Sequence, residues 1–329
     1  MRLWIELSGE HPTLPRAEAL AAFEAEGVQL GEVSWSSKVL RLDAVGPAPQ
    51  AAARLGLAHV VCEELAHGDL EDLREFARSQ DLAGKTFRTR ARAPGVDLDV
   101  AAVEGALGAD FGRSGRVDLV SPDIDFRVLV GEEFVLGRVL HRVDRPGMEA
   151  RTVTHRSFRL PISLHPKLAR ALVNLSRVPT GGIVADPFCG TGGIVLEAAR
   201  IGLRPVAADL RRTMVVGARE SLRALGADSA FLVADAGFGP WKRGSLGGIA
   251  TDPPYGRASS ARGEPVLRLY DRAFASFAEA LAPGRFAAVV LPSDTAVEAG
   301  EEHLELIERH TMRVHKSLAR NFCVFLRKP

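Results

Sequence analysis

Residues 182–193 read Gly-Ile-Val-Ala-Asp-Pro-Phe-Cys-Gly-Thr-Gly-Gly, an apolar run that ends in an acid and leads into a glycine-rich turn. The apolar residues predict a short buried strand, and residues 193–200 predict the helix after it. Glycine suits such a turn because the backbone bends sharply and can approach a ligand without a Cβ in the way. This segment alone fits a tight structural turn or a dinucleotide site, whereas the lack of a following Lys-Ser or Lys-Thr excludes a P-loop.

Strands and helices alternate around this segment. From about Pro161 onward we expect helices at 166–175, 193–200 and 213–225, and strands at 182–186, 204–209, 230–235, 249–252, 285–292 and 321–326. Such alternation implies an α/β fold with a doubly wound, mostly parallel sheet. In these sheets, ligands bind at the carboxyl ends of the strands.

Two further acids, Asp209 and Asp235, stand at the ends of the next two predicted strands. The first can accept both hydroxyl hydrogens of a ribose, and the second can accept from an adenine amine. Either acid could instead cap a turn or a helix. Because their order matches the glycine turn, we expect an adenosine cofactor, although hydride-transfer cofactors also remain compatible with this segment. The expected cofactor-binding residues are Asp186, Phe188, Gly190, Thr191, Gly192, Asp209, Asp235 and Ala236.

A second motif, Thr251-Asp252-Pro253-Pro254-Tyr255-Gly256, follows a later predicted strand. Its prolines stiffen the loop and leave carbonyl oxygens free to accept. An exocyclic amine of guanine or adenine is a poor nucleophile, but Asp252 and the Pro253 carbonyl could accept its hydrogens and direct its lone pair at a sulfonium methyl. Tyr255 offers a face for stacking an extruded base. A generic proline-rich turn is the alternative. We predict Asp252, Pro253, Pro254 and Tyr255 as catalytic residues that act with S-adenosylmethionine.

Cysteine chemistry at a pyrimidine carbon is the rival mechanism of base methylation. The chain has only Cys62, Cys189 and Cys323, and none follows a proline in a loop of this kind. We therefore assign Cys189 to packing. The wide spacing of the cysteines also argues against a zinc site or a disulfide framework, so no metal is expected.

The composition favours an intracellular protein of two or three domains. The chain has 329 residues and 46% hydrophobic content, and it lacks an apolar run long enough for a signal peptide or a membrane span. Its 42 Lys and Arg residues nearly balance 41 Asp and Glu, so overall charge does not indicate a nucleic-acid binder.

Local charge is more informative, because residues 138–170 hold eight Lys or Arg against two acids. This stretch could be a solvated linker or a phosphate-contacting surface. Its three interleaved histidines favour the second interpretation. We predict RNA contacts from Arg142, Arg145, Arg156 and Lys167. Upstream, strand-like and helical patterns suggest two small α/β modules, with strands at 2–7, 28–34, 39–45, 86–92, 124–130 and 134–140, and helices at 16–26 and 100–107.

The carboxyl-terminal half resembles the class I (Rossmann-like) amino-methyltransferases, whose cofactor turn and D/N-P-P-Y loop match 186–193 and 252–255. Residues 165–175 look like the helix before the cofactor strand in archaeal tRNA (guanine-N2) methyltransferases. That resemblance implies a seven-stranded sheet at 161–329, a ferredoxin-like domain at 1–80, a THUMP RNA-binding domain at 81–143 and a basic linker at 144–160. It also implies methylation of guanine 10 of tRNA, to the monomethyl or dimethyl form. We expect a monomer with no membrane partner, and the widely separated cysteines fit a reducing cytoplasm best.

Three other functions stay open at this point. The chain could modify another tRNA guanine or ribosomal RNA. A DNA adenine or cytosine amino-methyltransferase would use the same loop, but it would normally carry a DNA-recognition domain instead of two small α/β modules. A non-catalytic RNA-binding protein could keep the fold, although the intact acids and glycines argue against it.

Overall fold

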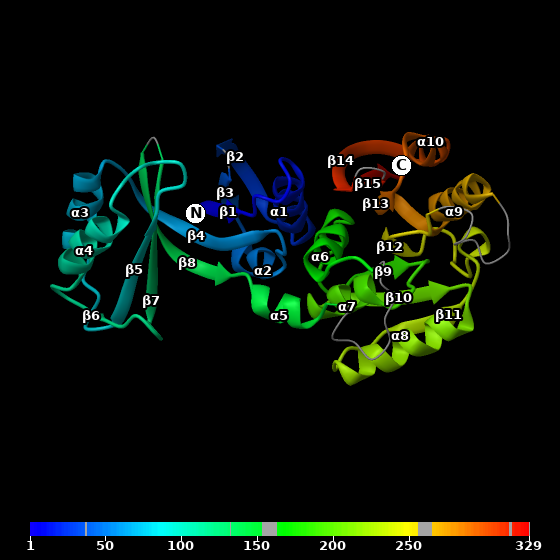
Figure 1. Cartoon of the computed structure of the whole chain (residues 1–329), viewed down its shortest axis with the longest axis horizontal. Helices are drawn as coiled ribbons and strands as arrows, with labels where there is room; N and C mark the ends of the chain where they lie inside the picture. The colour runs from blue at the N-terminus through cyan, green and yellow to red at the C-terminus, as the bar shows by residue number, and fades with distance from the viewer. Residues whose placement is uncertain (37, 132, 153–162, 256–264, 316–317, 329) are drawn as a thin grey trace. The chain divides into compact units, whose positions relative to one another are not determined.

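The computed structural model describes residues 1–36, 38–131, 133–152, 163–255, 265–315 and 318–328. These residues form two compact units, which are described separately (Figure 1). The first unit comprises residues 1–7, 29–49 and 58–142. The second unit comprises residues 8–28, 50–57 and 143–329.

The first unit is built on one eight-stranded sheet with the order β2-β3-β1-β4-β8-β7-β5-β6. The strands are β1 (Arg2–Leu7), β2 (Gln29–Ser36), β3 (Val39–Val45), β4 (Ala58–Gly68), β5 (Thr86–Arg92), β6 (Arg116–Val117), β7 (Ile124–Val130) and β8 (Phe134–Arg142). Helices α3 (Leu70–Ser79) and α4 (Val100–Phe111) lie together against this sheet (Figure 1). Their side chains share a core with Phe87, Phe126 and Val128.

The predicted strands of the first unit and its predicted helix at 100–107 are confirmed, apart from shifts of a few residues at their ends; the helix predicted at 16–26 is also confirmed, as α1 (Leu14–Ala25) of the second unit. In β5, Phe87, Thr89 and Ala91 are buried while the intervening arginines are more exposed, as period-2 alternation requires. Strand β4 and helix α3 have no predicted counterpart. Because β4 pairs with both β1 and β8, one sheet joins strands from 1–80 and from 81–143. The ferredoxin-like and THUMP domains stay predictions.

The second unit contains a seven-stranded sheet with the order β11-β10-β9-β12-β13-β15-β14. The strands are β9 (Ile183–Asp186), β10 (Arg204–Asp209), β11 (Ala230–Val233), β12 (Leu246–Thr251), β13 (Leu281–Leu291), β14 (Glu305–His315) and β15 (Leu318–Leu326). Neighbouring strands from β11 to β13 are parallel, and β15 runs antiparallel to both of its neighbours. The predicted Rossmann-like, mostly parallel sheet is confirmed.

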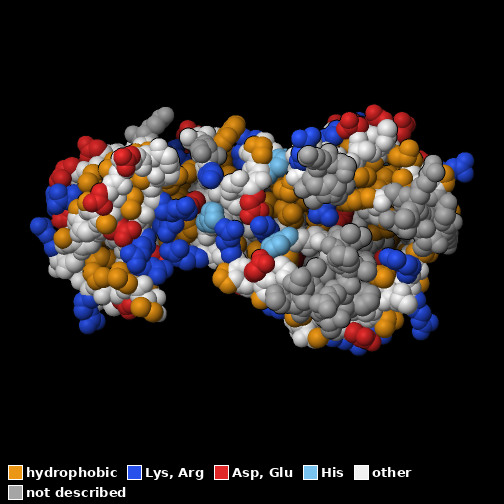
Figure 2. All heavy atoms as spheres, viewed as in Figure 1, with side chains coloured by type: hydrophobic (Ala, Val, Ile, Leu, Met, Phe, Trp, Pro, Cys, Tyr) orange, Lys and Arg blue, Asp and Glu red, His pale blue; other side chains and the backbone are white. Residues whose placement is uncertain are grey.

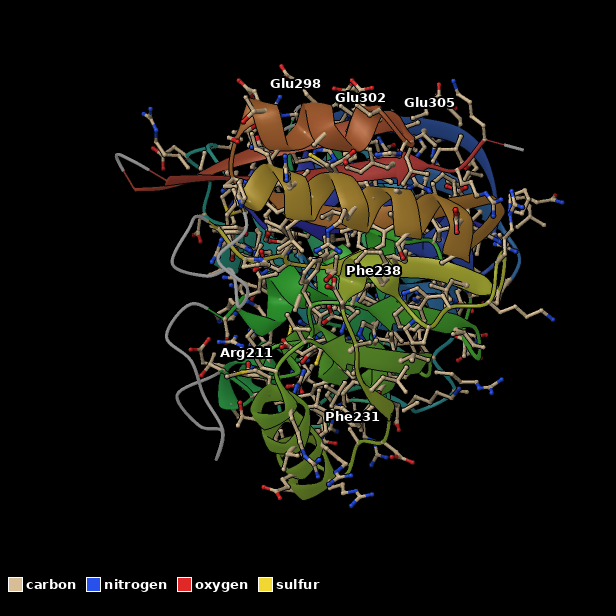
Figure 3. All side chains as sticks on the ribbon, turned by 90° about the vertical axis from the view of Figure 1, so that its right-hand side faces the viewer. Arg211, Phe231, Phe238, Glu298, Glu302 and Glu305 are labelled. Carbon is tan, nitrogen blue, oxygen red and sulfur yellow. The ribbon has the colours of Figure 1, made fainter. Side chains whose placement is uncertain are left out.

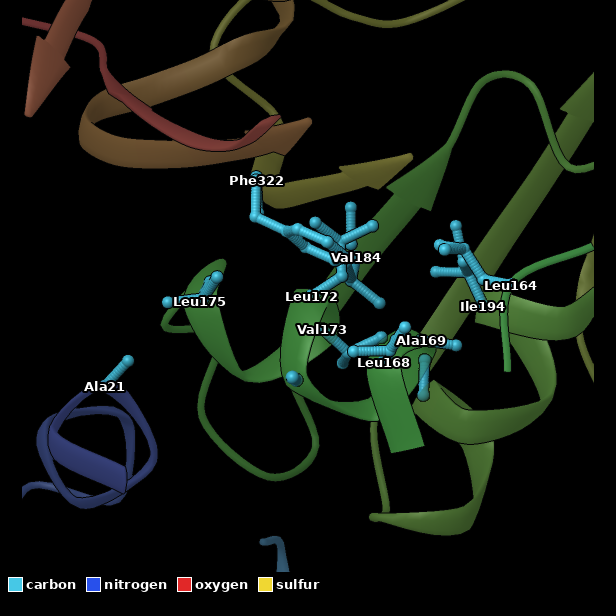
Figure 4. Close-up of a cluster of buried hydrophobic side chains, with 14 of the residues drawn as sticks. Ala21, Leu164, Leu168, Ala169, Leu172, Val173, Leu175, Val184, Ile194 and Phe322 are labelled. Carbon is cyan, nitrogen blue, oxygen red and sulfur yellow. The ribbon is translucent and has the colours of Figure 1, made fainter. Parts of the chain in front are cut away.

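Helices cover both faces of this sheet. The described helices of the second unit are α1 (Leu14–Ala25), α5 (Arg145–Ala150), α6 (Pro166–Leu175), α7 (Gly193–Arg200), α8 (Arg212–Ala224), the short 3-10 helix η2 (Ala236–Phe238), α9 (Val266–Ala280) and α10 (Asp294–Glu301). Helix α2 (Ala48–Ala53) has residues in both units. On one face, α6 packs its apolar side chains against Val184 and Phe322 of the sheet, and Ala21 of α1 belongs to the same core (Figure 4). On the other face, α9 and α10 form a second core, while Glu298 and Glu302 project outward from α10 (Figure 3).

Helix α1 belongs to the second unit because buried polar contacts tie it to α6. The Glu18 carboxylate accepts from the backbone N–H groups of Gly56 and Leu57, each at 2.7 Å, and from Asn174 Nδ2 at 2.9 Å. Burial raises the pKa of Glu18 to about 7, although these donors oppose the shift. A buried carboxyl group needs such partners, so this network fixes where α1 packs.

Candidate active site

The turn after β9 has the backbone conformation that its glycines predict. Gly190 has φ +49° and Gly192, at the start of α7, has φ +78°. A Cβ on Gly192 would lie 2.7 Å from Leu222 Cδ1 of α8, so a larger residue would be both strained and crowded. Cys189 packs in a core with Val195 of α7, which confirms its structural assignment.

Asp186 is the last residue of β9, and the two oxygens of its carboxyl group differ in their hydrogen bonding. The group is 3% exposed, and its Oδ1 accepts from Thr251 Oγ1 at 2.6 Å and from the Phe188 N–H at 3.3 Å. Its Oδ2 is buried and has no hydrogen-bond partner among the residues that the structure describes. Burial raises the pKa of Asp186 to about 7, and the nearby Asp252 and Asp209 raise it further. An orphaned, buried acceptor of this kind suits a donor or cation supplied by a ligand.

Asp209 and Asp235 reach the same edge of the sheet, because β9, β10 and β11 are adjacent and parallel. Asp209 ends β10 and accepts from the N–H groups of Gly190 (3.1 Å) and Arg211 (2.8 Å). Asp235 lies two residues beyond β11 and accepts from the Gly237 N–H at 2.9 Å. Both acids therefore act as turn caps, and Asp209 also holds the glycine turn in place. Their capping role does not occupy every lone pair, so it is compatible with ligand contact.

The Asp252 loop follows β12, the strand next to β9. The Tyr255 hydroxyl donates to Asp252 Oδ1. Burial raises the pKa of Asp252 to about 6, while the Tyr255 hydrogen bond and the positive charge of Arg320 oppose the shift. On α9, the buried Tyr270 hydroxyl donates to the Pro254 carbonyl oxygen at 2.7 Å. The loop is thus held at both its carboxylate and its backbone.

Several side chains around these loops were not predicted as site residues. The Thr251 hydroxyl donates to Asp186 and so links the two motifs. In the sequence, only its position next to Asp252 pointed to a role in the site. Arg272 of α9 donates to Asp235 at 3.3 Å, and Ser163 contacts Thr191 through their hydroxyls at 3.0 Å. No sequence motif surrounds Tyr270, Arg272 or Ser163, so the sequence did not point to them as site residues.

The predicted RNA contacts do not lie in one unit. Arg142 belongs to the first unit and donates from Nε to Asp125 at 2.8 Å. Arg145 and Lys167 belong to the second unit, where both pair with Glu10. Arg156 lies outside the described residues. The three described cations already have carboxylate partners, so a phosphate would compete with these acids.

Metal and membrane features can be assessed for the described part of the chain only. There, no group of three or more His, Cys, Asp or Glu side chains is arranged to hold a metal ion. Every helix in that part is too short or too polar to span a bilayer.

A seven-stranded Rossmann-like sheet with a glycine turn after β9 and an Asp-Pro-Pro-Tyr loop after β12 defines a class I amino-methyltransferase. Residues 154–321 match the family model described as the RMKL-like methyltransferase domain. The chain is 33% identical to a tRNA (guanine(10)-N2)-dimethyltransferase of Methanothermobacter thermautotrophicus, over 97% of this chain and 98% of that protein. It is 32% identical to the enzyme of the same name from Pyrococcus abyssi, over 98% of each chain.

The crystal structure of TrmN from Thermus thermophilus is also similar, with 25% sequence identity and a TM-score of 0.57 over 99% of this chain and 100% of that one. The chain therefore belongs to the tRNA (guanine(10)-N2)-dimethyltransferase family. The resemblance expected from residues 165–193 and 252–255 is confirmed.

Proposed function

We propose that this chain transfers methyl groups from S-adenosylmethionine to the exocyclic N2 amine of guanine 10 in tRNA. The observation that carries the proposal is full-length similarity to enzymes of that name, combined with an intact Asp252–Tyr255 loop at the end of β12. The product is N2-methylguanosine, N2,N2-dimethylguanosine or both. The names of the archaeal relatives favour the dimethyl form.

The residues at the ends of β9, β10 and β11 fit this cofactor. S-adenosylmethionine supplies an electrophilic methyl group on a positively charged sulfur, and it carries a ribose and an adenine. Asp186 offers its unpartnered Oδ2 to a cationic or N–H group, Asp209 accepts from the ribose hydroxyls, and Asp235 accepts from the adenine amine. The glycine turn, with Phe188 and Thr191, and Ala236 complete the proposed cofactor site.

For catalysis, the Asp252 loop accepts hydrogen bonds from the guanine amine. Because Tyr255 donates to Oδ1 of Asp252, we assign Oδ2 of Asp252 and the Pro253 carbonyl to the amine. These acceptors withdraw the amine hydrogens from the ring plane, so the nitrogen lone pair can point at the methyl group. They also stabilise the positive charge that develops on nitrogen. The Tyr255 ring provides the stacking face for the extruded base.

Arg142, Arg145, Arg156 and Lys167 are the proposed phosphate contacts, in keeping with the salt-dependent electrostatics of RNA binding. We further propose a ferredoxin-like domain at 1–80, a THUMP domain at 81–143, a linker at 144–160 and a methyltransferase domain at 161–329. The enzyme is proposed to act as a monomer in the cytoplasm, where its tRNA substrate is found.

The decisive experiment incubates the full chain with unmodified tRNA transcripts and labelled S-adenosylmethionine, followed by mass spectrometry of the nucleosides. Methylated guanosine at position 10 is expected, with none in a transcript that has adenosine there. Asp252→Ala should abolish transfer, whereas Asp228→Ala, a change at an exposed acid in the loop before β11, should not. Methylation at another guanine would favour the alternative position. Transfer to duplex DNA alone, or binding of tRNA without any transfer, would overturn the proposal.

A further inference from the structure

The second unit has a pocket of about 260 Å³ whose lining includes no residue of the glycine turn or of the Asp252 loop. It is formed where α5 meets the start of α6 and the turn before β4, and its lining residues are Gly56, Arg145, Pro146, Met148, Glu149, His165 and Lys167. Three of these side chains, Arg145, His165 and Lys167, are nitrogen donors. The pocket is smaller than most organic-ligand sites, and its size suits a phosphate group with part of a sugar.

Two of the donors converge on a single oxygen atom. Lys167 Nζ lies 2.7 Å from Glu10 Oε1, and Arg145 Nη2 lies 3.6 Å from the same atom. A phosphate oxygen is an acceptor of the same kind and carries at least as much charge. The position of Glu10 Oε1 therefore marks a place where this protein already holds an oxyanion.

The Glu10 contacts are exchangeable. The side chains of Arg145, Lys167 and Glu10 are 47%, 26% and 30% exposed, so water screens their attraction. His165 Nε2 lies 3.0 Å from Glu149 Oε2, whose side chain is 70% exposed. A polyanion that brings a phosphate to the pocket can thus replace Glu10 at small cost, because it releases condensed counterions as it binds.

We propose that Arg145 and Lys167, which line this pocket, form a subsite for one backbone phosphate of the tRNA, and that Glu10, which pairs with both cations without lining the pocket itself, is displaced from them by the RNA. The inference rests on the proposed function. Arg145 and Lys167 bind the phosphate, and His165 contributes a third donor. Glu10 acts as an internal competitor that lowers affinity for any polyanion. Acids and cations both lie on the face of the molecule shown in Figure 2, and pairing of the Glu10 kind limits non-specific RNA binding.

The test is equilibrium binding of fluorescent tRNA to the full chain between about 50 and 200 mM salt, the range over which phosphate contacts change affinity strongly. Glu10→Gln should tighten binding by up to about fivefold, the factor that corresponds to one exposed ion pair. The double variant Arg145→Ala, Lys167→Ala should weaken binding and lower the salt slope by about one. Adding Glu10→Gln to the double variant should give no further gain.

The matched control is the double variant Arg285→Ala, Lys328→Ala, which removes the same charge at two exposed positions away from the pocket. Unchanged or weaker tRNA binding by Glu10→Gln would overturn the inference, as would equal effects of the pocket and control variants. A second experiment measures the binding of inorganic phosphate to the same variants. If it binds the pocket while the tRNA affinities of all variants agree, the pocket is a small-anion site and the RNA assignment is wrong. If the unmodified protein neither binds nor methylates tRNA, the proposed function itself fails.

Discussion

Tyr270 offers a sharp test of how the catalytic loop is held. Its side chain is 1% exposed on α9, and its hydroxyl donates to the Pro254 carbonyl at 2.7 Å. Tyr270→Phe keeps the ring and its packing against Phe274 and neighbouring residues of the same core. The change therefore removes one hydrogen bond to the loop and little else.

The expected size of the effect follows from that hydrogen bond. Losing it should cost about 1 kcal/mol of stability, because a partly buried carbonyl oxygen is left without this donor. If the bond also fixes the Asp252 loop, the turnover number kcat should fall by about tenfold, since small displacements of positioning groups weaken transition-state contacts. The KM for S-adenosylmethionine should hardly change, because the proposed cofactor residues follow β9, β10 and β11.

Ser176→Ala is the matched control. The buried Ser176 hydroxyl donates to the Val173 carbonyl at 2.6 Å, so its loss removes one buried side-chain hydrogen bond just after α6, outside both loops, while the Ser176 N–H still donates to that carbonyl. Thermal melting should show comparable destabilisation in both variants, and initial rates should show a lower kcat only for Tyr270→Phe. An unchanged kcat in Tyr270→Phe, or an equal loss in both variants, would refute a positioning role.

Four further outcomes are expected. Asp252→Asn should lower kcat by about a hundredfold or more while calorimetry shows unchanged cofactor affinity, because the acceptor charge acts on the transition state; loss of cofactor binding would contradict this. The ratio kcat/KM should rise with pH and level off above about 6, because burial raises the pKa of Asp252 and its carboxyl group is protonated below that pH. A flat profile between pH 5 and 7 would argue against an ionised acceptor. Asp186→Asn should weaken S-adenosylmethionine binding by about tenfold, the scale of a charged hydrogen bond, in the same calorimetric assay; unaltered affinity would remove Asp186 from the site. Burial raises the pKa of Glu18 to about 7, so between pH 4.5 and 7 the folded protein keeps a proton on Glu18 that the unfolded chain releases. The free energy of unfolding should therefore fall as pH rises from about 4.5 to 7. Urea titrations of Glu18→Gln should show a shallower fall.

The parts of the site that could be predicted from sequence are those whose structure is set locally. The glycine turn is an example, since positive φ at Gly190 and Gly192 requires that residue type wherever the chain folds. The carboxyl ends of β9, β10 and β12 were also predicted within one residue, because short apolar runs that end in acids or prolines have few other interpretations.

Contacts between distant residues could not be predicted in this way. Glu18 binds Asn174, which lies 156 positions later, so the place of α1 in the second unit is invisible in the local pattern. Strand β4 mixes apolar residues with Glu63 and Glu64. It pairs with β1 and β8, and its own sequence does not predict these partner strands. Tyr270 looks like any core aromatic of an amphipathic helix until its hydroxyl is seen at the Pro254 carbonyl.

The charges near the glycine turn distinguish between the two classes of cofactor that its sequence allows, a dinucleotide and S-adenosylmethionine. Burial is the main cause of the raised pKa of Asp186, and the nearby Asp252 and Asp209 raise that pKa further, so the turn lies beside mutually repelling carboxylates. The pyrophosphate of a dinucleotide would add negative charge to this cluster, whereas a sulfonium and an ammonium group would neutralise part of it. The site therefore favours a cationic cofactor. Methyl transfer removes the sulfonium charge, so the proposed contact with Asp186 should hold the product less tightly than the cofactor and favour product release.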